Sequence, residues 1–167
     1  LDVAAENKVN KVFLHAFTDG RDCDPKSGAY FINDIQEHMA KTTGELASIT
    51  GRYFAMDRDK RWERVKISYD AMVNAVGSTS NNAIESIEKS YADNVTDEFI
   101  KPIIMTNADG TPKGQIKADD VIIFFNYRTD RGRELTEVLT QQDYPEFGMK
   151  TMPLHYVTIT NYDETYK

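Results

Sequence analysis

The sequence predicts an α/β fold, a three-layer α/β/α sandwich in which a mostly parallel mixed sheet lies between layers of helices. Short β-rich runs alternate with amphipathic helical segments, an order that is typical of this class. One run, Val121 to Phe125, is apolar without interruption, as expected for a strand covered on both faces. A length of 167 residues suits a single domain, residues 1–167, that can bury a core.

The predicted elements of the first part begin with the last turns of an amphipathic helix, Leu1 to Lys8. A β-rich run at 11–17 predicts the first strand, and a loop rich in Asp, Gly and Pro follows it. Ser27 then predicts the cap of a helix that runs to about residue 40. A second strand is expected at 46–50.

The clearest predicted helix is 59–76, because its apolar residues recur on one face at helical spacing before Gly77. That face consists of Trp62, Val65, Tyr69, Met72, Val73 and Val76. Ser80 predicts the cap of another helix that ends at Tyr91 and turns Ile84 and Ile87 inward. The remaining expected elements are a turn at 109–112, a strand at 121–125, a helix at 130–140 and a strand at 154–160.

Composition and charge exclude several classes of protein. Acidic residues number 27 against 20 basic ones, and the formal charge of −7 argues against general nucleic-acid binding. No apolar run approaches the roughly 20 residues that cross a bilayer, so no membrane partner is expected. The one cysteine, Cys23, allows no internal disulfide, which favours a reducing compartment and a cytoplasmic location. The chain begins at Leu1 and stops just after a strand-like run, so we expect a fragment truncated at both ends.

The arginines gather in three places, whereas the lysines are scattered. Each group follows a predicted strand or opens a predicted helix, where ligands of open α/β sheets bind. A guanidinium group can grip a carboxylate or phosphate with two parallel hydrogen bonds. The pattern therefore predicts one pocket for a small, highly anionic ligand. The groups are Arg21; Arg52, Arg58, Arg61 and Arg64; and Arg128, Arg131 and Arg133.

Two of these arginines have a simpler interpretation. Arg61 and Arg64 follow a helical step of three and lie beside acidic residues, which favours a solvated salt-bridge face. Arg52 and Arg58 precede or open the helix, and for them ligand contact is favoured.

The first predicted strand ends in Asp19-Gly20-Arg21-Asp22. Here Arg21 is a candidate for holding an anion, and Asp22 for accepting a proton or binding a hydroxyl. Asp19 is interpreted as a turn former, and His15, inside the strand, as a core histidine. No His, Asp and Glu spacing resembles a metal site, so no metal ligand is expected.

Four segments, in the right order over essentially the whole chain, resemble the cofactor-independent phosphoglycerate mutases. The most specific is the second, Gly51-Arg-Tyr-Phe-Ala-Met-Asp-Arg-Asp-Lys-Arg-Trp-Glu-Arg64. The others are Leu14 to Asp22, Phe124 to Arg133 and Thr158 to Asp163.

The resemblance implies an isomerase that interconverts 3-phosphoglycerate and 2-phosphoglycerate through a phosphoserine. Enzymes of this family have a phosphatase-like domain, which carries the serine and two Mn²⁺ ions, and an inserted domain that binds the glycerate. The chain resembles most of the inserted domain. No cofactor is therefore expected in this chain, and its expected partners are the two phosphoglycerates and the phosphatase-like domain that it lacks.

The resemblance also implies roles for six residues. Asp22 is the expected catalytic residue, because the family's aspartate at this position handles a hydroxyl proton. Where the family usually has Thr-Pro-Pro next, this chain has Cys23-Asp24-Pro25, which adds a negative charge near the anion site. The expected substrate-binding residues are Arg21, Asp22, Arg52, Arg58, Arg128 and Arg131.

Three other interpretations stay open at this point. The chain fits a non-catalytic binding module for a phosphorylated metabolite. It also fits a relative such as a phosphopentomutase, or an interaction domain for RNA or protein that uses arginine-rich loops. On its own, the chain is expected to be folded but inactive.

Overall fold

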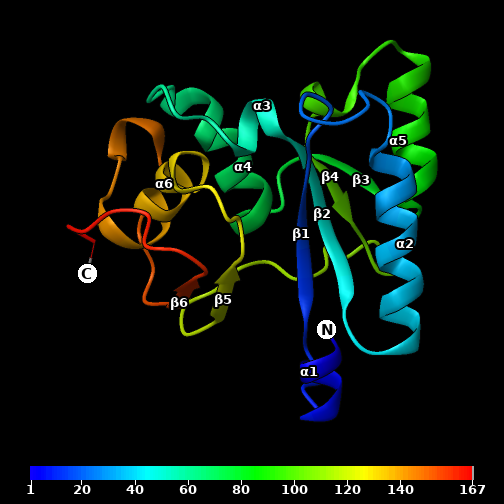
Figure 1. Ribbon diagram of the computed structural model, residues 1–167, viewed down its shortest axis with the longest axis horizontal. Helices are drawn as coiled ribbons and strands as arrows, with labels where there is room; N and C mark the ends of the chain where they lie inside the picture. The colour runs from blue at the N-terminus through cyan, green and yellow to red at the C-terminus, as the bar shows by residue number, and fades with distance from the viewer. Residues whose placement is uncertain (167) are drawn as a thin grey trace.

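The computed structural model describes residues 1–166 and contains two β-sheets with helices around them (Figure 1). The larger sheet has four strands in the order β1-β2-β4-β3. The β1/β2 and β3/β4 pairs are parallel and the β2/β4 pair is antiparallel, so the predicted mostly parallel mixed sheet is confirmed. The strands are β1 (Phe13–Thr18), β2 (Glu45–Gly51), β3 (Ser78–Ser80) and β4 (Ile103–Met105).

Helices lie on both sides of the larger sheet, as the sandwich prediction requires. The short α1 (Asp2–Glu6) precedes β1. Figure 1 shows α2 (Gly28–Lys41) and α5 (Ala83–Ala92) along one side, and α3 (Arg52–Ala55) and α4 (Trp62–Val73) on the other. The core between the sheet and α2 and α5 is apolar and fully buried. Its most buried members are Ile49, Ile87 and Ile100.

A second, smaller sheet pairs β5 (Val121–Phe124) with β6 (His155–Thr158) in parallel. It packs with α4 and with α6 (Thr129–Thr136), which continues as a wider π-helical segment, η2 (Glu137–Gln141). Two 3₁₀ turns, η1 (Asp97–Phe99) and η3 (Pro145–Phe147), complete the elements. None of the helices within residues 1–166 combines the length and the apolar character needed to cross a bilayer.

The prediction that the strand at 121–125 is covered on both faces is wrong for the described residues. Ile122 and Phe124 pack toward the core of α4 and α6, but Val121 and Ile123 are 67% and 63% exposed. The apolar run therefore has one face in this core and one face toward solvent.

The helix predicted at 59–76 is shorter in the structure, where α4 spans only Trp62–Val73. It begins at Trp62 because the buried carboxylate of Asp57 accepts the amides of Asp59 and Arg61, and these bonds fold 57–61 into a turn. Lys60 has a left-handed backbone within that turn, with φ of 56°. The turn thus replaces the first helical turn that the sequence predicts.

Two short strands, β3 and β4, are absent from the sequence prediction, and Ser80 does not cap a helix. Ser80 ends β3, and the side chain of Asn82 caps α5 by accepting the amide of Glu85 at 3.2 Å. Ile87 is buried as predicted. The missed strand β4 bears on the functional site, because it directly follows η1 and η1 contributes residues to the cleft described next.

Candidate functional site

A cleft of about 290 Å³ lies where the loop after β1, helix α3 and the segment after it, η1 and the start of α6 come together. Most of its charged wall is arginine. Three acidic residues, Asp57, Asp59 and Glu98, stand among six arginines. The arginines are Arg21, Arg52, Arg58, Arg61, Arg64 and Arg131.

Sheet topology brings the first two arginines together. Because β1 and β2 are parallel neighbours, their carboxyl ends share one edge of the sheet, and Arg21 and Arg52 follow those ends. Gly20 permits the tight turn between β1 and Arg21: its φ is 64°, and an added Cβ would lie 2.7 Å from Cβ of Asp97. The loop therefore packs closely enough on η1 to hold Arg21 beside Glu98.

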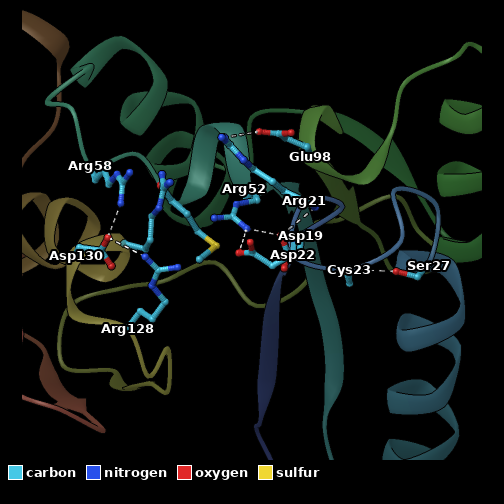
Figure 2. Close-up of polar contacts among 12 residues, drawn as sticks. Asp19, Arg21, Asp22, Cys23, Ser27, Arg52, Arg58, Glu98, Arg128 and Asp130 are labelled. Carbon is cyan, nitrogen blue, oxygen red and sulfur yellow. Dashed lines mark hydrogen bonds and ion pairs between the residues drawn. The ribbon is translucent and has the colours of Figure 1, made fainter.

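Arg52 is the most deeply buried of the six, at 5% exposure. Its Nη1 donates to Asp19 and, at 2.7 Å, to Oδ2 of Asp22 (Figure 2). Burial opposes the charge of Arg52, but the bonds to Asp22 and Asp19 raise its pKa above the usual value. Burial likewise favours neutral Asp19, yet Arg52 and the amides of Asp22 and Arg21 hold the pKa of Asp19 below its usual range. Arg52 and Asp19 are therefore both charged at neutral pH.

Asp19 has two functions in this loop. Its Oδ1 accepts the amides of Arg21 and Asp22 at 3.2 and 3.3 Å, which confirms the turn-forming interpretation. It also binds Arg52, a contact that the sequence does not reveal. Asp22, the predicted catalytic residue, stays 63% exposed at its side chain while it accepts from Arg52. It lies beside the cleft and does not form its wall.

The opposite wall is built at the start of α6. Asp130 accepts from Arg58 at 2.9 Å and from Arg128 at 3.2 Å, so it bridges two predicted substrate-binding residues (Figure 2). Arg58 lines the cleft, whereas Arg128 is 58% exposed and joins it only through Asp130. Asp130 stands in the same motif as Arg128, whereas Arg58 belongs to the motif at 51–64, and nothing in the spacing of Asp130 distinguishes it as a bridge.

Arg131 is held differently from the other arginines of the cleft. Its Nη1 donates to the carbonyl of Met56 at 2.8 Å, and its buried Nε has no hydrogen-bond partner among residues 1–166. Burial and the like charges of Arg58 and Arg52 lower the pKa of Arg131. A guanidinium group stays protonated at neutral pH even so. Among residues 1–166 no carboxylate forms an ion pair with Arg131, so its positive charge on the cleft wall is offset only in part, by nearby Asp130.

The predicted ion pairs of Arg61 and Arg64 are confirmed, but they do not form a solvated helical face, because Arg61 precedes α4 and the carboxylate that pairs with Arg64 is buried. Arg64 lies 3.6 Å from Asp57 and Arg61 lies 4.0 Å from Asp59. Both nevertheless line the cleft, and the guanidinium carbon of Arg64 stands 3.8 Å from the centre of the Tyr53 ring. The helical step of three from Arg58 does not explain this placement, because Arg58 and Arg61 lie in the turn before α4.

The remaining candidates lie outside the cleft. His15 is a core residue, as predicted, because its ring nitrogens bond to Ser48 and to the carbonyl of Gly114, and burial lowers its pKa to about 4. Cys23 is exposed. Within the part of the chain that the structure describes, no group of three or more His, Cys, Asp and Glu residues is arranged to hold a metal ion.

Comparison with known proteins gives consistent matches. The family model described as BPG-independent PGAM N-terminus matches residues 1–164. A 2,3-bisphosphoglycerate-independent phosphoglycerate mutase from Flavobacterium psychrophilum is 57% identical over the whole chain, and one from Clostridium tetani is 48% identical over 99% of it. The chain spans only 33% and 32% of the lengths of these two relatives.

A solved structure has the same fold. A crystal structure of Leishmania mexicana phosphoglycerate mutase, determined at low cobalt concentration, superimposes with a TM-score of 0.90 at 28% sequence identity. The match covers 97% of this chain and 31% of the Leishmania chain. The arrangement of sheets and helices described above is therefore shared with a much longer protein.

Proposed function

Because the chain belongs to the family of BPG-independent phosphoglycerate mutases, as the N-terminal part that the family model describes, we propose that it is the substrate-binding domain of such an enzyme. The full-length enzyme would interconvert 3-phosphoglycerate and 2-phosphoglycerate in glycolysis and gluconeogenesis. A cytoplasmic location is part of this proposal.

One observation carries the proposal to the level of residues: six arginines surround a cleft of about 290 Å³, and Arg131 has no carboxylate partner among residues 1–166. A phosphoglycerate offers a carboxylate and a phosphate on three carbons, so it supplies several anionic oxygens within a small volume. Arg21, Arg52, Arg58 and Arg131 would bind these oxygens, with Arg128 closing the site from beyond Asp130. The clamp would orient the substrate and exclude water during phosphoryl transfer.

Asp22 would serve as the proton acceptor and donor for the substrate hydroxyl. A serine outside this chain would take the phosphoryl group: the ester P–O bond to glycerate breaks, a P–O bond to serine forms, and the released glycerate oxygen is protonated. The other glycerate hydroxyl would then lose its proton to Asp22 and attack the phosphoserine: a P–O bond to glycerate forms, the P–O bond to serine breaks, and the serine oxygen takes up a proton. The ion pair with Arg52, 2.7 Å from Asp22, would fix the direction of the carboxylate.

The family resemblance implies two Mn²⁺ ions in the full-length enzyme, and the residues described here do not fit them. No suitable cluster of ligands occurs within residues 1–166. We therefore assign no step of this domain to a metal, and we propose that the metals and the serine belong to the phosphatase-like remainder of the protein.

The proposal is tested by arginine variants of the full-length enzyme, assayed for conversion of 3-phosphoglycerate. Arg21→Ala and Arg131→Ala are each expected to lower turnover by roughly 10²-fold or more, the scale for removing one charge-stabilising donor. Arg133→Ala is the matched control, because Arg133 lies on the same helix as Arg131 but bonds to the carbonyl of Tyr162, away from the cleft.

Near wild-type turnover in both cleft variants would overturn the assignment. The assay also separates the proposal from a non-catalytic binding module. A module would bind phosphoglycerate through the same arginines, but the full-length protein would then convert none of it.

A further inference from the structure

The segment between α3 and α4 carries five residues of the cleft wall, and two buried carboxyl groups, those of Asp57 and Glu134, hold it in place. The five are Met56, Asp57, Arg58, Asp59 and Arg61. Asp57 accepts the amides of Asp59 and Arg61, both at 3.0 Å. From the other side, Oε1 of Glu134 on α6 accepts the amide of Lys60 at 2.8 Å. Three successive amides are thus bound by two carboxyl groups, each 5% exposed.

Only one of the two carboxyl oxygens of Glu134, Oε1, has a hydrogen-bond partner among residues 1–166. Its Oε2 is buried and has no hydrogen-bond partner within the described residues. A buried carboxylate oxygen without a donor costs free energy, whereas a protonated carboxyl group can donate its hydrogen to a neighbouring carboxylate. The neighbour is Asp57, whose carboxylate helps to raise the pKa of Glu134.

The charges around Glu134 favour the protonated form. Burial has the largest effect; the amide of Lys60 opposes it, while Asp57 and, more weakly, Glu137 add to it, and together they raise the pKa of Glu134 to about 7. The other ionisable groups nearby are Tyr144, whose hydroxyl bonds to Glu137, and Arg64, which lies 3.6 Å from Asp57. In the structure, Arg64 pairs with Asp57 and no cation pairs with Glu134 among residues 1–166.

We infer that Glu134 is a positioning residue of the cleft, which in its protonated form donates to Asp57 and so holds the segment 57–61 with Arg58 and Arg61 facing the substrate. Arg131, one helical turn before Glu134, binds the carbonyl of Met56. Helix α6 therefore hydrogen-bonds to the segment between α3 and α4 at two points, through Arg131 and through Glu134. The inference rests on the proposed function, because it assigns Glu134 to binding of the same anionic substrate.

The sign of the pH effect follows from the raised pKa. Below about pH 7, Glu134 keeps its proton and the pair with Asp57 is intact. As the pH rises through 7, two carboxylates face each other in a buried site, and the hydrogen bond between them is lost. We therefore expect substrate binding by the cleft to weaken on the alkaline side.

The test compares three variants of the full-length enzyme by KM and kcat for 3-phosphoglycerate between pH 7 and pH 9. Glu134→Gln keeps an acceptor for Lys60 and a permanent donor for Asp57 but cannot ionise. Glu134→Ala removes both. Glu63→Gln is the control, because Glu63 is an exposed carboxylate in the first turn of α4. Each KM is divided by the wild-type value at the same pH, which cancels the titration of the substrate phosphate.

For Glu134→Gln, this ratio is expected to be closest to 1 at pH 7, where about half of wild-type Glu134 keeps its proton, and to fall by about fivefold or more by pH 9, because only wild-type Glu134 leaves its competent form. Glu134→Ala should raise KM by roughly tenfold at pH 7, the effect of losing a buried hydrogen-bonding partner, with a smaller change in kcat. Glu63→Gln should keep a constant ratio.

A pH-independent ratio for Glu134→Gln, or equal KM values for Glu134→Gln and Glu134→Ala, would overturn the inference. Failure of the proposed function would look different. In that case the wild-type protein would show no mutase turnover, or Arg131→Ala would leave it unchanged.

Discussion

The arginines of the cleft are held by different kinds of contact, and the contacts predict what each side chain contributes. Arg52 is buried and binds two carboxylates, so it is part of the fold as well as of the anion site. Arg58 is 47% exposed and shares Asp130 with Arg128, so both can turn toward a ligand at little cost. Arg131 bonds to the carbonyl of Met56, and its buried Nε has no partner among residues 1–166.

Arg52→Lys tests the role of the guanidinium geometry at the most buried position. A lysine keeps the charge but has no planar fork, so it cannot match the bonds to Asp19 and Asp22 while facing the substrate. We expect kcat/KM of the full-length enzyme to fall by roughly 10- to 100-fold, the range for one hydrogen bond to a charged group. Steady-state kinetics with 3-phosphoglycerate measures the change.

Arg133→Lys is the control for that substitution and should remain near wild type. If Arg52→Lys also retained wild-type kcat/KM, charge alone would account for the role of Arg52, and the two-carboxylate contact would be irrelevant to binding.

Sequence reasoning could place some of these residues, and the reason is topological. Arg21 and Arg52 follow the first and second predicted strands. When two parallel strands are neighbours, the residues that follow their carboxyl ends lie at the same edge of the sheet. The bridge from Arg58 to Asp130 joins positions 72 residues apart, and Arg131 reaches Met56 over 75 residues. Such contacts depend on how α6 packs against the α3–α4 segment, which local pattern does not encode.

At the scale of elements, the three-residue turn η1 holds together several elements next to the cleft, mainly through Asp97. Asp97 is 1% exposed, and its carboxylate accepts the amide of Gly28 at 2.7 Å and the hydroxyl of Tyr91 at 2.5 Å. Its carbonyl accepts from Thr18 at 2.8 Å. The residue thus ties the end of β1, the start of α2 and the end of α5 together, next to Glu98 in the cleft wall.

Asp97→Asn is expected to lower the free energy of unfolding by roughly 1–3 kcal/mol, because an amide group then faces one of the two donors and leaves it unsatisfied. Thermal unfolding of the full-length enzyme measures the effect as a lower midpoint. Asp93→Asn, an exposed position just after α5, is the control and should change the midpoint little. Equal midpoints for the two variants would contradict the assigned role of Asp97.

Element boundaries were predictable where a long periodic pattern existed and unpredictable where tertiary contacts set them. The core face of α4 was readable because Val65, Tyr69 and Met72 repeat at helical spacing, and all three are buried. The three-residue strands β3 and β4 carry too little pattern to be distinguished from loop. These residues form strands because of their tertiary contacts: β4 is hydrogen-bonded to β2 on one side and to β3 on the other.

At the scale of the whole molecule, the smaller sheet has an apolar surface that no described residue covers. We call it the outer face of β5 and β6. Its members are all more than half exposed, and they are neighbours on one sheet. A contiguous exposed apolar surface of this kind marks a contact site, whereas apolar residues scattered singly over a surface do not. The chain spans about a third of the length of its relatives, so the remaining two thirds offer material to cover this face. The outer face consists of Val121, Ile123, Phe125, Val157 and Ile159.

Ile123→Lys is therefore expected to have opposite effects in two settings. In the 167-residue chain alone, a lysine at a position that is 63% exposed should reduce self-association, as seen in the concentration dependence of light scattering. In the full-length enzyme, where we expect the outer face to be buried, an unpaired charge should destabilise folding by several kcal/mol and lower the unfolding midpoint. Val76→Lys, at another exposed apolar position away from this face, should do neither. If Ile123→Lys leaves the full-length midpoint unchanged, the face is a free surface in the complete protein too, and the uninterrupted apolar run from Val121 to Phe125 does not encode burial on both sides.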